Sequence, residues 1–181
     1  LCNEIKPYKT HVLSTIDVAR LNTQPITIIR HPVDRFISSF YYWKKGSEDI
    51  KEWQRSNNWK TANAIETPDD LISILKNPQH PLYKKTKYSL TNKDQYTHIY
   101  HFTPQSRWIT ANTNPIIICF DSKNLSNNIQ KTFDHLQVNC PIKEMPIINK
   151  SKKPKRPVQL NEESLKWLQN IYAKDFKLWQ Q

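Results

Sequence analysis

Arg30 and Ser38 are the residues whose types and spacing most clearly suggest chemistry, in the segment Arg-His-Pro-Val-Asp-Arg-Phe-Ile-Ser. β-Branched residues before Arg30 predict a buried strand, and Pro32 with Asp34 predicts a helix directly after it. An arginine at a strand end, a hydroxyl two turns into the next helix and that helix's free N–H groups could together bind a phosphate. A strand-end ion pair between Arg30 and Asp34 explains the arginine equally well. Arg35, inside the helix, is expected to pair with an acidic residue.

Glycine and charge narrow the kinds of site that the chain can contain. Gly46 is the one glycine among 181 residues, so a Walker A loop or a G-x-G-x-x-G turn cannot form within the chain. The formal net charge of +11 favours an anionic partner, such as nucleic acid, acidic polysaccharide, nucleotide or lipid. The three cysteines lack C-x-x-C spacing, so we expect no metal site. No apolar run approaches the ~20 residues of a membrane span.

The elements that must position these residues follow an alternating order. Apolar runs predict strands over 25–30 and 116–120. Helices are expected from Pro32 to about Lys45, from Thr67, from about Ser122 to Leu136 and from Asn161. We expect a loop over 79–96 and irregular structure over 141–160. Strand-helix-strand-helix order predicts an α/β fold with a central parallel sheet covered on both faces, in one domain over 1–181. Ligands of such sheets bind beyond the carboxyl ends of the strands, where Arg30 lies.

The same segment resembles a known family motif. Ile-Ile-Arg-His-Pro-Val-Asp-Arg-Phe-Ile-Ser-Ser-Phe-Tyr-Tyr is similar to the 3′-phosphate-binding motif of Golgi-type carbohydrate sulfotransferases, a strand followed by Arg-Asp-Pro-x-x-Arg-x-x-Ser and aromatics. His31 stands where the family usually has Asp. The resemblance assigns Arg30 and Ser38 to the 3′-phosphate of 3′-phosphoadenosine 5′-phosphosulfate (PAPS), the sulfuryl donor. It also implies a three-layer fold like that of P-loop NTPases, and a reaction without metal.

Three further segments carry the resemblance toward the acceptor and the nucleotide. Tyr8-Lys9-Thr10-His11-Val12 is similar to the Gly-His-Val segment of uronosyl 2-O-sulfotransferases, which makes His11 the candidate general base. The segment from His98 to Gln105 is similar to the family's His-x-x-Pro-Gln segment, so we expect His98 and His101 to line the acceptor cleft or to cap a loop. Gln105 and the nearby Arg107 are expected to contact the substrate. The segment Ile148 to Lys153 looks like the late basic loop that closes over the nucleotide, with Asn149, Ser151, Lys152 and Lys153 as ligands.

The C-terminal helix and an aromatic, basic segment complete the set of candidates. Tyr172-Ala173-Lys174-Asp175-Phe176 resembles the family's C-terminal Tyr-x-x-Asp-[Phe/Tyr] signature. Lys44 and Lys45 interleave with tryptophans, Trp43 among them, and this pattern suits a platform for an acidic sugar. An ordinary amphipathic helix with its lysine stems along the apolar surface explains the pattern slightly better.

One part of the family pattern is missing. The 5′-phosphosulfate loop, roughly Pro-Lys-[Thr/Cys]-[Gly/Ala]-[Ser/Thr]-[Ser/Thr], normally lies well before the arginine strand, but only 29 residues precede Arg30 here, and Lys6-Pro7-Tyr8-Lys9-Thr10 does not fit it. We therefore expect a chain that lacks its true N-terminus, or a degenerate relative. A eukaryotic member with an upstream anchor would reside in the Golgi lumen, and any other in the cytoplasm.

The leading prediction is a PAPS-dependent O-sulfotransferase that modifies a hydroxyl of an oligo- or polysaccharide. The alternative is a non-catalytic basic domain that binds acidic polysaccharide or nucleic acid, which predicts broad binding that weakens steeply with salt. Zinc-finger spacing, RNP-type aromatics and a basic zipper are all absent from the sequence, so a nucleic-acid partner is disfavoured.

Overall fold

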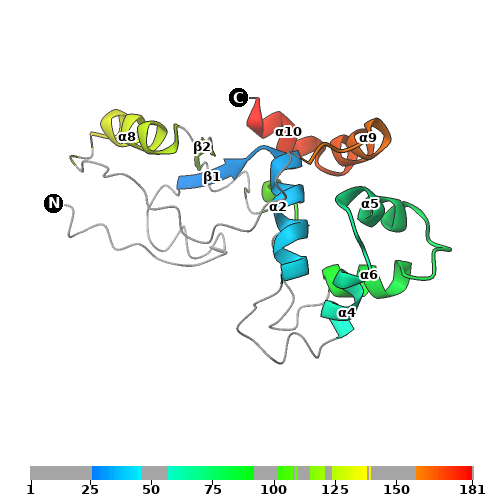
Figure 1. Cartoon of the computed structure of the whole chain (residues 1–181). Coiled ribbons are helices and arrows are strands. Elements are labelled where there is room, and N and C mark those ends of the chain that lie inside the picture. The colour runs from blue at the N-terminus through cyan, green and yellow to red at the C-terminus, as the bar shows by residue number, and fades with distance from the viewer. Residues whose placement is uncertain are drawn as a thin grey trace. The chain divides into compact units, whose positions relative to one another are not determined.

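The computed structural model describes residues 26–45, 57–91, 102–107, 109, 115–120, 124–137, 139 and 158–180 (Figure 1). Two compact units divide the chain. The first contains Leu1–His31, Gln105–Ile148 and Lys177–Gln181, and the second contains Pro32–Pro104 and Asn149–Phe176. Each unit is therefore assembled from segments that are far apart in the sequence.

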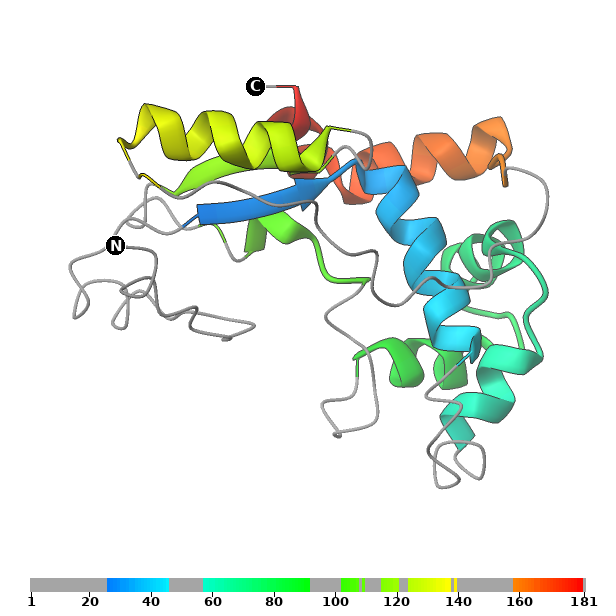
Figure 2. The ribbon, with the colours of Figure 1, turned by 60° about the vertical axis from the view of Figure 1, so that its left-hand side comes forward.

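The first unit is built around a parallel strand pair. β1 (Ile26–Arg30) pairs with β2 (Ile116–Phe120) in a register that runs from Ile26 opposite Ile116 to Arg30 opposite Phe120. The carboxyl ends of the two strands therefore coincide. α8 (Leu125–His135) packs alongside β2 (Figure 2), and the Asn128 side chain donates a hydrogen bond to the Cys119 carbonyl at 3.4 Å. The sequence-based predictions of both strands, of their parallel arrangement and of this helix are confirmed.

Burial of the sheet is less complete than the apolar runs predict. Ile29 and Ile118 are 2% and 4% exposed, whereas Ile26 and Ile28 are 42% and 41% exposed. Successive side chains of a strand point to opposite faces, so one face of β1 is buried and the other is open among the described residues. Coverage of both faces of the sheet therefore stays a prediction, and the described part of the chain contains a mixed α/β arrangement with two strands. The three-layer fold stays a prediction.

The second unit is helical. It contains α2 (Pro32–Lys45), α4 (Asn57–Asn63), α5 (Pro68–Lys76), α6 (Tyr83–Thr91), α9 (Glu162–Ile171) and most of α10 (Ala173–Trp179). Phe36, Phe40 and Trp43 recur on one side of α2 at helical spacing and are at most 3% exposed. They join a core with residues of α4, α5 and α9, and α2 packs against all three helices (Figure 1).

Two helix predictions need correction. The sequence predicts a loop over 79–96, but α6 occupies Tyr83–Thr91. The lysines of this segment leave no clean apolar periodicity, and the residue that it buries fully is the polar Thr86. The helix expected from Asn161 is interrupted at Tyr172, where the backbone leaves helical geometry between α9 and α10. The start of α5 is as predicted: Thr67 and Asp70 form a reciprocal capping box.

Candidate anion site at the end of the sheet

Arg30 is the last residue of β1 and lies half-buried at the carboxyl end of the strand pair. Its partner across the sheet is Phe120, and its guanidinium carbon lies 5.3 Å from the centre of the Phe120 ring. An arginine packed over an aromatic face keeps its charge, because the ring contributes no opposite formal charge. The residue lies at the carboxyl end of parallel strands, where ligands of such sheets bind.

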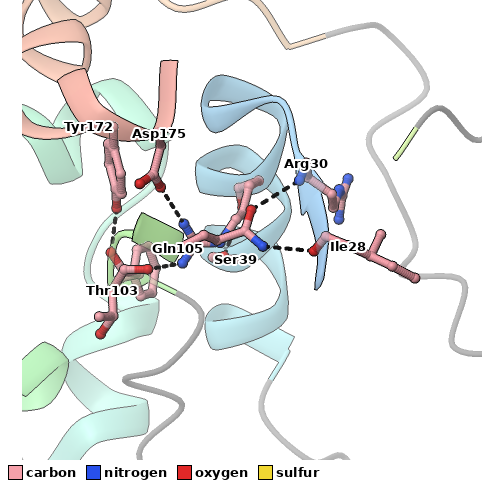
Figure 3. A network of polar contacts seen from close by, with 9 residues as sticks. Ile28, Arg30, Ser39, Thr103, Gln105, Tyr172 and Asp175 are labelled. Atoms are coloured by element: carbon pink, nitrogen blue, oxygen red, sulfur yellow. Dashed lines mark hydrogen bonds and ion pairs between the residues drawn. The ribbon is translucent and has the colours of Figure 1, made fainter. Parts of the chain in front are cut away.

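Gln105 holds the backbone of the same strand (Figure 3). Gln105 begins the short 3-10 helix η2 (Gln105–Arg107), and its side-chain oxygen accepts a hydrogen bond from the Arg30 N–H at 3.0 Å. The amide nitrogen of the same side chain donates to the Ile28 carbonyl at 3.1 Å. The contact of Gln105 with an acceptor stays a prediction, and in the structure both ends of its side-chain amide bond to the backbone of β1.

His31 and the C-terminal turn border this end of the sheet. The His31 ring meets the Trp179 ring edge-on, with centroids 5.6 Å apart and an interplanar angle of 84°. The Cys119 thiol donates to the Trp179 carbonyl at 3.8 Å, and burial raises the pKa of that thiol. His31 therefore has an aromatic partner in the first unit.

Ser38 lies on α2, in the second unit, with a half-buried side chain. Its neighbour Ser39 is buried, and the Ser39 hydroxyl donates to the Arg35 carbonyl one turn earlier at 2.7 Å. Of the two serines, Ser39 is thus part of the helix packing, and Ser38 is the one with partial access to solvent. Its role at a 3′-phosphate stays a prediction.

A buried network around Arg35 connects α2 to the C-terminal helices within the second unit. Arg35 Nη1 lies 3.3 Å from Asp175 Oδ2, and the two side chains are only 9% and 4% exposed. The other guanidinium nitrogen donates to the Thr103 carbonyl, and the Tyr172 hydroxyl donates to the Phe102 carbonyl (Figure 3). The guanidinium carbon also lies 5.9 Å from the centre of the Tyr172 ring. The expectation that Arg35 pairs with an acid is confirmed.

The electrostatics of this network favour a neutral Tyr172. Burial raises the pKa of Tyr172 to about 12, with Arg35 lowering it and Asp175 raising it by smaller amounts. The phenol therefore stays protonated and donates its hydrogen bond at any physiological pH. The residues of the Tyr-x-x-Asp signature thus act here as structural partners of α2 and of the segment that leads to Gln105.

The ammonium group of Lys44 is hydrogen-bonded to the protein backbone. It donates to the Ile65 carbonyl at 2.6 Å and lies 5.6 Å from the centre of the Phe40 ring. Trp43 is 1% exposed, so its ring cannot support a sugar. These contacts favour the amphipathic-helix interpretation of this segment. Arg107, by contrast, is exposed on η2.

Several candidate residues lie outside the described part of the chain. They are His11, His98, His101, Asn149, Ser151, Lys152, Lys153 and the side chain of Lys45. Within the described residues, no group of three or more His, Cys, Asp or Glu side chains could hold a metal ion. Nor is any helix there both long and apolar enough to cross a bilayer.

Comparison with known proteins addresses the whole chain rather than single residues. No curated protein and no solved structure gives a significant match. A family model described as the Sulfotransferase family matches residues 3–180, nearly the full length. The chain therefore belongs to the sulfotransferase family.

Proposed function

We propose that this sulfotransferase transfers the sulfuryl group of PAPS to a hydroxyl of an acidic oligo- or polysaccharide. The observation that supports the donor assignment is the place of Arg30 at the carboxyl end of a parallel strand, with its guanidinium packed on Phe120. Membership of the family supports sulfuryl transfer in general. The excess of Lys and Arg, which gives a net charge of +11, suits an acceptor that carries carboxylates or sulfates.

In the proposed reaction the acceptor oxygen forms a bond to sulfur while the bond from sulfur to the 5′-phosphate oxygen breaks. Adenosine 3′,5′-bisphosphate leaves with the electron pair of that bond, and the proton of the acceptor hydroxyl passes to a base. His11 is the base that the family resemblance assigns, and an imidazole is suited to accept a proton at neutral pH. Arg30 would hold the 3′-phosphate of the donor, with Ser38 as a second ligand by resemblance, and so fix the nucleotide for an in-line transfer.

The donor assignment is tested by calorimetry with two nucleotides. Arg30→Ala should weaken the binding of adenosine 3′,5′-bisphosphate by about 2 kcal/mol, or roughly 30-fold, because a charge-assisted bidentate contact is lost. The affinity for adenosine 5′-monophosphate, which lacks the 3′-phosphate, should not change. Lys84→Ala removes one exposed positive charge from α6 and serves as the matched control. Equal affinities of wild type and Arg30→Ala for the bisphosphate would refute the assignment.

The acceptor is tested by incubating the chain with ³⁵S-labelled PAPS and a panel of neutral and acidic glycans. Label on acidic glycans supports the proposed function. Binding of every polyanion without transfer, weakening steeply as salt rises, would instead identify a non-catalytic polyanion-binding domain.

A further inference from the structure

The side chain of Gln105 contacts β1 as a neighbouring strand would. Its oxygen accepts from the Arg30 N–H at 3.0 Å, and its nitrogen donates to the Ile28 carbonyl at 3.1 Å (Figure 3). The peptide groups of a strand alternate in direction, so these two groups face the same edge of β1. In a parallel ladder, one residue of an adjacent strand makes this same pair of bonds with its own N–H and C=O. Gln105 therefore completes one rung of a ladder with a side-chain amide.

This rung lies at the last residue of the strand, where the chain turns into α2. An unpaired N–H or C=O at such an edge would exchange with water, and the end of the strand would fray. Gln105 fixes the Arg30 peptide, while Phe120 packs against the Arg30 guanidinium at 5.3 Å. The backbone and the side chain of Arg30 are thus held by two separate partners within the first unit.

We propose that Gln105 is a positioning residue for Arg30, and that it raises the affinity for a nucleotide 3′-phosphate without touching that phosphate. The inference rests on the proposed function of Arg30 and adds a residue that acts through it. A primary amide is needed because the position requires one acceptor and one donor side by side. Glutamate would place an oxygen against the Ile28 carbonyl, and asparagine is one methylene too short to reach both groups.

The test is a cycle of Gln105→Leu and Arg30→Ala, with calorimetric titration of adenosine 3′,5′-bisphosphate into each variant of the full chain. Gln105→Leu alone should weaken binding about tenfold, because two hydrogen bonds that orient Arg30 are lost. In the Arg30→Ala background the same change should have no further effect, since its target is gone. Gln169→Leu, on the exposed surface of α9, is the matched control and should bind as wild type does. Gln105→Asn replaces Gln105→Leu if the latter does not fold.

Two results would overturn the inference. Unchanged affinity in Gln105→Leu would show that Arg30 needs no such support. An equal tenfold loss in both backgrounds would show that Gln105 acts directly on the nucleotide.

Hydrogen exchange at the Arg30 amide separates this inference from the proposed function. Exchange should be faster in Gln105→Leu than in wild type, whatever ligand Arg30 binds, and an unchanged rate would refute the rung itself. Failure of the proposed function has a different signature, namely an Arg30→Ala variant that binds the bisphosphate as tightly as wild type.

Discussion

Removal of the Asp175 carboxylate tests how the second unit is held together. Asp175 is 5% exposed, and its carboxylate is 3.3 Å from the guanidinium of Arg35, which is also buried. In Asp175→Ala the arginine keeps the Thr103 carbonyl and the Tyr172 ring but loses its counter-charge. Removing one partner of a buried ion pair lowers the free energy of unfolding by about 3 to 5 kcal/mol. Because Arg35 keeps these two other contacts, we expect a loss of ~3 kcal/mol, at the lower end of that range. That is a large part of the ~5–15 kcal/mol by which a domain is stable.

The double variant distinguishes a buried charge from a packing defect. Arg35→Met with Asp175→Leu replaces both charges by apolar side chains, so the unpaired charge disappears and most of the loss should be recovered. We expect the double variant to be more stable than Asp175→Ala by ~2 kcal/mol in urea unfolding followed by tryptophan fluorescence. The exposed pair of Lys76 and Glu163 is the control, and Lys76→Ala should cost less than ~1 kcal/mol. A loss in Asp175→Ala as small as that of Lys76→Ala would refute the reasoning.

Two further predictions concern buried hydroxyl groups. The folded pKa of Tyr172 is about 12 against an unfolded value of 10.0, so its contribution to stability is complete below pH 10 and is lost as pH rises from 10 to 12. Wild type should lose about 3 kcal/mol more than Tyr172→Phe across that window in urea unfolding, and parallel curves would contradict the raised pKa. Thr86 is fully buried, and its hydroxyl has no hydrogen-bond partner among the described residues. Thr86→Val, of nearly equal shape, should therefore raise the free energy of unfolding by ~1 kcal/mol, and a loss of stability would reveal a partner for that hydroxyl.

The sequence was sufficient for elements whose signals are local. The β-branched run before Arg30, the proline at the start of α2 and the helix start at Thr67 each specify structure within a few residues, and the structure contains all three. α6 gave no such signal, because the residue that this helix buries fully is the polar Thr86 and not an apolar side chain. Propensity and periodicity cannot identify a helix that depends on tertiary packing of this kind.

The same distinction between local signals and tertiary contacts applies to the residues of the candidate site. Arg30 at a strand end could be predicted, because strand, break and helix follow one another in sequence. That Arg35 would need an acid was also predictable, but Asp175 lies 140 positions away and no local pattern selects it. The contact of Gln105 with β1 joins a side chain to backbone groups that every residue possesses, so no residue type or spacing reveals it.

The scattered make-up of the two units constrains how a nascent chain can acquire this structure. Arg35 emerges from the ribosome 140 positions before Asp175. The apolar side of α2 can pack against Leu168 and Tyr172 only after a similar delay. At a synthesis rate of ~5–20 residues per second, that delay is on the order of ten seconds. Phe36, Phe40 and Trp43 therefore lack these two core partners on the nascent chain until the C-terminal helices have been synthesised.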